Sequence, residues 1–230
     1  MGKTKTALEI KNLHAWKNQV SIIENLNFSA KQGEMIALVS TCKIARLSLL
    51  DSLLGINPNR KGSIRIHQTE AIHLAAGSVP KLGMALCSKE TGLDPELTCE
   101  ENLLMPLNGH SLGGGLPLTE IYLLFPELAQ YKDSPCTNLS PGSQLLLALA
   151  RVLRSSADII VLHDLYQDLY PAMRHRTHEL FSQLKQRGYT IILNESNKCF
   201  AASLADQLYY IENAKAQLYT LPPHLKHCLN

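Results

Sequence analysis

The chain has 230 residues, of which 45% are hydrophobic and 18% are charged, and its formal net charge is +2. This length allows one large domain, or a domain with a small subdomain, around a substantial hydrophobic core. The balanced composition excludes a disordered chain, and no apolar run approaches the roughly 20 residues that a membrane-spanning helix needs. The small net charge and the lack of a basic stripe interleaved with aromatic residues favour no nucleic-acid partner.

The six cysteines are spread along the chain without a CxxC pair. This pattern predicts reduced, mostly buried thiols in a cytosolic protein, and no apolar stretch typical of a signal peptide follows the N-terminus. His224 and His227 lie near the C-terminus beside Cys228. Because no other residues there supply ligands, we expect a polar tail and no metal site.

The first part of the chain is rich in strands. Apolar and polar residues alternate over residues 6–31, which predicts two or three antiparallel strands with one solvated face. The apolar run Met35–Val39 predicts a buried strand, and leucines at helical spacing then predict a helix that Gly55 ends. Short strands are expected at Gly62–Ile66 and Gly83–Cys87.

Helical patterns dominate the middle of the chain, from Glu100 to about Lys132, with a loop at Gly109–Pro117. Ser140-Pro141 is typical of a helix start, because serine caps the first amides and proline suits the first helical position. The rest predicts, in order, a buried strand, a helix, a strand, a short helix and a hairpin. These elements are expected at Ile159–Leu162, Ala172–Arg187, Tyr189–Leu193, Phe200–Ala205, Leu208–Ile211 and Gln217–Tyr219.

Strands that alternate with helices predict an α/β fold, with a parallel sheet covered by helices on its faces. The antiparallel strands at the N-terminus make that sheet mixed. Residues 1–230 are expected to form a single domain, in which a helical subdomain at about 94–157 is inserted into the α/β core.

Several segments, in order along nearly the whole chain, resemble the ATP-binding cassette (ABC) transporter ATPases, a P-loop NTPase-like family. QGEMIALVSTCKIARLSLLDSLLG, from Gln32, is similar to the family's first nucleotide motif, in which a buried strand precedes G-x-x-x-x-G-K-[S/T] and a helix. NLSPGSQLLLALARVL, from Asn138, is similar to the signature motif LSGGQ and its helix. Four further segments resemble the family's other motifs: GLDPELTCEENLLMPL, ADIIVLHDLYQDLYP, GYTIILNESN and ADQLYYIENAKAQLY. The resemblance implies a mixed core sheet, an antiparallel β-subdomain and an inserted helical subdomain.

The loop that would hold phosphate contains no glycine. A phosphate loop points successive backbone N–H groups inward, which requires residues that tolerate positive φ. Ser40 stands for the first glycine of the motif and Ala45 for the last. Arg46 stands for the lysine that reaches the β- and γ-phosphates, and Leu47 for the hydroxyl that holds Mg²⁺. We therefore expect a turn of another shape, with Lys43 and Arg46 as surface cations without a specific partner. The vestigial loop comprises Ser40, Thr41, Cys42, Lys43, Ile44, Ala45, Arg46, Leu47 and Ser48.

The other catalytic positions that the resemblance implies have also changed. His163 and Asp164 stand where the family has the magnesium-binding aspartate and the catalytic glutamate. Ser196 replaces the switch histidine, and Lys89 takes the glutamine-loop position. Trp16 lies near the position of the aromatic residue that stacks on adenine, although plain packing explains a lone tryptophan too. Without these groups phosphoryl transfer lacks its electrostatic elements, so we expect no functional catalytic residue and a structural or solvent-facing Asp164.

The signature keeps Ser140, Gly142 and Gln144, which the resemblance places opposite the γ-phosphate held by the second subunit of a head-to-tail dimer. An ordinary helix start explains the same residues equally well.

Gly109–Gly113 reads G-x-S-x-G, as in the nucleophile elbow of serine hydrolases. Because that elbow needs a buried strand before it and a helix directly after it, we expect a glycine loop here.

The sequence therefore predicts a degenerate, non-hydrolysing ABC cassette, a cytoplasmic subunit of a membrane transport complex that is peripheral on the inner face of the membrane. Its expected partners are a transmembrane permease, docked near Lys89 and the helical subdomain, and a second cassette in a hetero- or homodimer. No cofactor of its own is expected, and ATP with Mg²⁺ binds through the partner subunit or weakly. An active ATPase with atypical motifs and a cassette-derived scaffold or regulator without a transport role stay open as alternatives.

Overall fold

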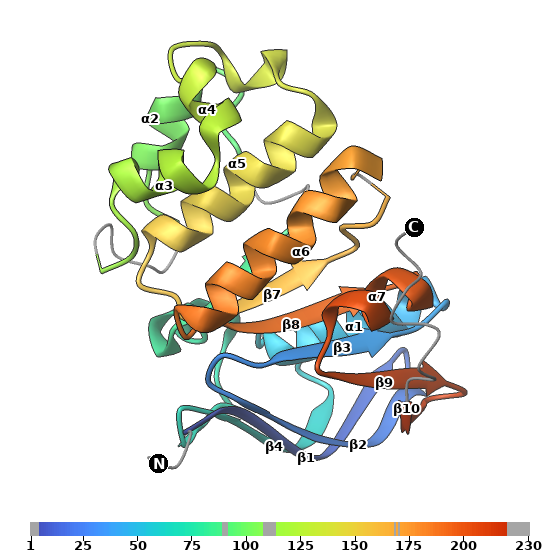
Figure 1. The fold of residues 1–230 in the computed structure, drawn as a ribbon. Helices are drawn as coiled ribbons and strands as arrows, with labels where there is room; N and C mark the ends of the chain where they lie inside the picture. The colour runs from blue at the N-terminus through green and yellow to red at the C-terminus, as the bar shows by residue number, and fades with distance from the viewer. Residues whose placement is uncertain (1–4, 89–91, 108–113, 168, 170, 220–230) are drawn as a thin grey trace.

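The computed structural model describes residues 5–88, 92–107, 114–167, 169 and 171–219, and Figure 1 shows how its elements are arranged. Its strands form one ten-stranded sheet in the order β5-β4-β1-β2-β10-β9-β3-β8-β7-β6. The strands are β1 Thr6–Lys17, β2 Val20–Lys31, β3 Met35–Val39, β4 Arg60–Ile66, β5 Thr69–Glu70, β6 Met84–Cys87, β7 Ile159–His163, β8 Thr190–Glu195, β9 Gln207–Glu212 and β10 Lys215–Tyr219.

The antiparallel strands at the N-terminus are β1, β2, β4 and β5, and β1 pairs with both β2 and β4, while β9 and β10 form the predicted antiparallel hairpin. Leu8 and Ile10 on β1 are buried, whereas Glu9 between them is partly exposed, so one face of these strands covers the core. Two long strands thus account for residues 6–31, within the two or three that the alternation predicts.

The parallel part of the sheet holds β3, β6, β7, β8 and β9. The first four of these strands are almost wholly buried, as their continuous apolar runs predict. β8 lies between β3 and β7, with Val39 opposite Glu195 and His163 opposite Asn194. Because these strands run in the same direction, their carboxyl ends meet at one edge of the sheet.

Helices cover both faces of these parallel strands (Figure 1). The helices are α1 Lys43–Leu53, α2 Cys99–Leu104, α3 Leu118–Leu124, α4 Pro126–Gln130, α5 Pro141–Arg154, α6 Pro171–Gln186 and α7 Lys198–Leu204. Alternate residues of β3 enter two apolar cores: Ile36 and Leu38 pack with α1 and the antiparallel strands, and Ala37 packs with α5 and α6. The predicted mixed α/β arrangement is therefore confirmed.

Helices α2, α3 and α4 gather against α5, beside the sheet (Figure 1). Ser140 and Pro141 start α5 as predicted, and Gly55, at φ 80°, follows the end of α1.

None of the described helices has the length and apolarity that crossing a bilayer requires. Of the five cysteines described, Cys87, Cys99 and Cys136 are buried and all five are free thiols. His224, His227 and Cys228 lie outside the described residues.

Candidate functional site

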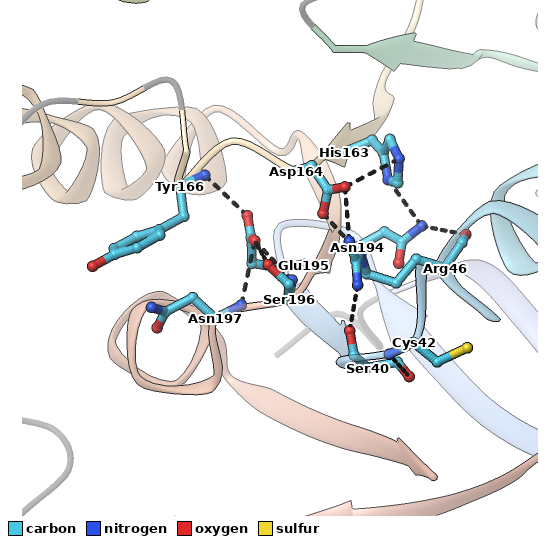
Figure 2. A network of polar contacts seen from close by, with 10 residues as sticks. All are labelled: Ser40, Cys42, Arg46, His163, Asp164, Tyr166, Asn194, Glu195, Ser196 and Asn197. Atoms are coloured by element: carbon cyan, nitrogen blue, oxygen red, sulfur yellow. Dashed lines mark hydrogen bonds and ion pairs between the residues drawn. The ribbon is translucent and has the colours of Figure 1, made fainter. Parts of the chain in front are cut away.

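The candidate site lies where β3, β7 and β8 end (Figure 2). Ser40 follows β3, Asp164 follows β7 and Ser196 follows β8. The backbone N–H of Ser40 donates to the carbonyl of Glu195, and that of Asp164 donates to the carbonyl of Asn194. The sheet therefore brings together three segments that are widely separated in the sequence, at the edge where open α/β sheets usually bind ligands.

The turn after β3 has no phosphate-cradle shape. None of residues 40–48, all of which the structure describes, has a positive φ. α1 begins as early as Lys43, and Cys42 precedes it in an extended conformation. The Ser40 hydroxyl donates to the carbonyl of Ile211 at 2.8 Å and accepts from the N–H of Cys42 at 3.3 Å. The first helical turn thus replaces the open loop, because these residues form a helix more readily than a left-handed turn.

Arg46 points into the protein and binds Asp164. Its Nε donates to one carboxylate oxygen at 2.9 Å and its Nη2 to the other at 3.1 Å, while its Nη1 donates to the carbonyl of Ser40 at 2.7 Å. The Arg46 side chain is 6% exposed and that of Asp164 is 22% exposed. The expectation that Arg46 is an unpartnered surface cation is wrong, because α1 turns its side chain toward the end of β7. Lys43 is exposed, as expected.

Asp164 adopts a positive φ of 51°, a conformation that aspartate and asparagine tolerate better than most residues. The Nε2 of His163 lies 3.6 Å from the Asp164 carboxylate. Asn194, which sequence reasoning missed, donates from its side-chain amide to the carbonyl of Arg46 at 2.8 Å. Its buried Oδ1 has no hydrogen-bond partner among the described residues. The polar Asn194 in the otherwise apolar β8 is a signal that could have found this position.

Glu195 is a second residue that sequence reasoning missed. It is fully buried, and its carboxylate accepts from the N–H groups of Tyr166, Ser196 and Asn197. The hydroxyl of Ser196 also donates to it, at 3.2 Å. The loop after β7 is thus held on two sides, through Asp164 to α1 and through Tyr166 to the end of β8.

The signature residues lie at the start of α5 and hold that helix end. The exposed Ser140 accepts from the N–H of Ser143 at 3.2 Å, and the two hydroxyls lie 2.9 Å apart. Gly142 is buried. The side-chain amide of Gln144 points back and donates to the carbonyls of Cys136 and Leu139. These contacts are local, and none of them joins the network of Figure 2.

Trp16, at the end of β1, also lies outside that network. Its ring stacks on His14 with 5.9 Å between centroids, and the Lys61 ammonium lies 5.9 Å from the ring centre. Trp16 lines a 430 Å³ cavity with Gln19, Pro58, Asn59, Arg60 and Lys61. Adenine stacking therefore stays a prediction. Lys89 and Gly109–Gly113 lie outside the described residues.

The remaining loop residues offer little to a magnesium–nucleotide complex. Thr41, Cys42 and Ile44 are exposed, Ala45 and Ser48 are buried, and Leu47 is partly buried. Leu47 has no oxygen where the motif needs one, and both Asp164 oxygens already bind Arg46. No cluster of metal-ligating side chains occurs within the described parts of the chain. These residues do not fit Mg²⁺ and a triphosphate in the observed arrangement.

The fold defines the class of protein. A nucleotide-free ATP-binding cassette from an ABC transporter has a TM-score of 0.80 over 97% of this chain and 95% of its own, at 17% identity. A dimeric cassette in a post-hydrolysis state, bound to ADP and Pi, has a TM-score of 0.77, with 94% and 99% covered at 18% identity. The chain therefore has the ATP-binding cassette fold, as predicted.

The sequence comparison then shows the family. Residues 23–165 match the ABC transporter family, so the chain belongs to it and the predicted resemblance is confirmed. The high-affinity branched-chain amino acid transport ATP-binding protein BraG of Pseudomonas aeruginosa is 25% identical over 221 residues, which is 92% of this chain and 91% of BraG.

Proposed function

We propose that this chain is a cassette subunit of an ABC transport complex that does not itself hydrolyse ATP. The Arg46–Asp164 pair carries this proposal, since it occupies the residues that stand for the phosphate-binding lysine and the catalytic glutamate. Family membership supports a place in a transport complex, and the relative BraG is a transport ATP-binding protein. The proposed location is the cytoplasm, on the inner face of the membrane.

Phosphoryl transfer needs positioned charge around the phosphate, the metal and the attacking water. Here the Nε, Nη1 and Nη2 of Arg46 already have internal acceptors. Both oxygens of Asp164 accept from that guanidinium, so the carboxylate is held on Arg46 and not directed at a phosphate-bound water. Ser196 offers a hydroxyl, already donated to Glu195, in place of an imidazole. Each catalytic role therefore lacks a residue to perform it.

The start of α5 supports a different role in a dimer. Ser140 is exposed at the N-terminus of a 14-residue helix, where backbone amides and the helix dipole favour an anion. A cassette that holds ATP and Mg²⁺ at its own phosphate loop would receive this helix end at the γ-phosphate. We therefore propose a partner cassette, with nucleotide bound at the partner's loop and completed by this chain's signature.

The proposed permease surface is a groove with a cavity volume of 620 Å³. Its walls are mostly apolar and come from the segment before the helical insertion and from the insertion itself. Ile56 is 54% exposed and Met105 is 41% exposed on this lining. Exposed apolar side chains around a concave surface mark an interaction site, and a short permease helix would bury them.

The test is calorimetry and an ATPase assay on the full chain. We expect no saturable Mg-ATP binding with a dissociation constant below about 10 μM, and turnover at background. Asp164→Glu is expected to rescue no turnover, because the metal still lacks its ligands. Tight binding that Arg46→Met removes, or a clear gain of turnover in Asp164→Glu, would favour the active ATPase instead.

A pull-down from native membranes separates the transport role from the scaffold alternative. Recovery of a permease and an intact cassette with this chain is expected. Recovery of neither, with no ATPase in any complex that contains the chain, would favour a scaffold or regulator.

A further inference from the structure

The Arg46–Asp164 contact has the geometry of a guanidinium bound to an oxyanion. Two parallel N–H···O bonds of 2.9 and 3.1 Å join the fork of Arg46 to both oxygens of one carboxylate. The same fork fits a phosphate group, which presents its oxygens at similar spacing. We propose that Asp164 is an internal ligand of Arg46, which takes the place of a bound phosphate and keeps free oxyanions from the start of α1. This inference deepens the proposed function and rests on it.

The buried state of Arg46 explains why it needs such a ligand. A guanidinium with 6% of its side chain exposed is costly unless it is paired and hydrogen-bonded. An anion from solution would have to displace a carboxylate that belongs to the same chain. Tethering gives Asp164 a high effective concentration, so a dilute anion competes poorly.

Hydrogen bonds from β8 and its neighbours fix both Arg46 and Asp164 in position. The Asp164 backbone N–H donates to the carbonyl of Asn194, and the Asn194 side-chain amide donates to the carbonyl of Arg46. The N–H of Tyr166 donates to the carboxylate of Glu195 at 3.0 Å, so the loop after Asp164 is fixed as well. A carboxylate fixed in this way loses little freedom when it binds Arg46, which strengthens it against a free competitor.

Removal of the carboxylate should therefore expose an anion site. Asp164→Asn is the sharpest variant, because asparagine keeps the shape and tolerates the φ of 51° but carries no charge. Asp164→Gly is the second variant, since glycine also tolerates that φ and has no side chain to refill the site. Asp164→Asn combined with Arg46→Met is the control that removes the guanidinium.

The experiment titrates inorganic pyrophosphate into the full chain and its variants by calorimetry, with circular dichroism melts to confirm folding. We expect Asp164→Asn and Asp164→Gly to bind pyrophosphate at least about tenfold more tightly than the unchanged chain, a difference of about 1.4 kcal/mol. The double variant should lose this gain.

The outcomes separate the two proposals. If the unchanged chain binds no pyrophosphate and the folded single variants bind it no better, the proposal that Asp164 is an internal ligand is wrong. The proposed function would then still stand. A gain that persists without Arg46 would also overturn the internal ligand. Tight, Arg46-dependent binding of pyrophosphate and Mg-ATP by the unchanged chain would overturn both.

Discussion

At the scale of single residues, Arg46 shows how a substitution changes the role of a position. A lysine in the motif reaches outward to a ligand, whereas this arginine reaches inward to the carbonyl of Ser40 and the carboxylate of Asp164. A buried pair of this kind adds little net stability, because burial of both charges offsets their attraction. Loss of one partner is costly, because the other charge then lies buried without a counterion.

This asymmetry predicts the behaviour of Arg46→Met. We expect a loss of about 2 kcal/mol in the free energy of unfolding, less than for a fully buried pair because Asp164 is 22% exposed. Urea denaturation measures it. Arg46→Met with Asp164→Asn should recover part of the loss, which a double-mutant cycle would quantify. The matched control Lys43→Met, at an exposed position on the same helical turn, should change stability by less than about 0.5 kcal/mol. An equal loss of stability in Arg46→Met and Lys43→Met would contradict the structural role of Arg46.

The cysteines give a second prediction at this scale. Burial raises the pKa of the Cys87 thiol to about 12, so this thiol stays protonated at neutral pH and is a poor nucleophile. Cys42 and Cys199 are exposed. Iodoacetamide at pH 8, followed by peptide mass spectrometry, should label Cys42 and Cys199 well before Cys87. In urea, which unfolds the chain, the three cysteines should be labelled at similar rates. Labelling of Cys87 as fast as Cys42 in the folded chain would show that β6 is less protected than described.

At the scale of elements, α5 combines a structural role with a proposed functional one. Ser140 caps the helix, and Arg154 near its end donates to the carbonyls of Leu103 and Leu116, so α5 organises the surrounding helical segments. A hydroxyl that caps a helix and also faces a partner's phosphate affects two measurable quantities. Stability and turnover report on them separately.

Ser140→Ala should therefore cost about 1 kcal/mol of stability through the lost cap. It should also lower ATP turnover by the assembled complex, because a donor aimed at developing phosphate charge is stronger in the transition state. The matched control is Thr98→Ala. Thr98 caps α2 through a hydrogen bond of 3.2 Å, the same length as the capping hydrogen bond of Ser140. Thr98→Ala should lose similar stability but keep turnover. Equal turnover in the two variants would make Ser140 an ordinary helix cap.

The elements were largely predictable, whereas the site was not. Strands and helices follow from the spacing of buried residues, a local property that β3 and α5 show clearly. The early start of α1 was missed, because the motif comparison indicated a turn where local preferences favour a helix. Arg46 and Asp164 were both singled out, but a contact across 118 residues depends on the register of β3, β7 and β8. Asn194 and Glu195, at the carboxyl end of β8, stand out as polar residues in an apolar strand, but their roles depend on partners that are distant in the sequence.

At the scale of the whole molecule, one sheet joins the candidate site to the proposed permease surface. The parallel strands end at Ser40 and Asp164 on one side, while β6 at the sheet edge lines the apolar groove through Met84 and Leu86. The Arg46–Asp164 pair and the proposed permease surface thus lie on the same sheet. In the proposed complex, this sheet would connect a cassette without nucleotide at its own loop to the permease.

The groove yields the last prediction, tested with Ile56→Asp. Ile56 lines the groove and is 54% exposed, so an aspartate there remains hydrated in the free chain and should hardly alter its unfolding. A docked permease segment would bury that carboxylate without a partner, which is costly enough to weaken the complex strongly. We expect the permease to be lost from pull-downs of Ile56→Asp. Leu123→Asp is the matched control, because Leu123 on α3 is 78% exposed and lies outside the groove lining. It should leave the pull-down unchanged. Retention of the permease by a folded Ile56→Asp would place the docking surface elsewhere on the cassette.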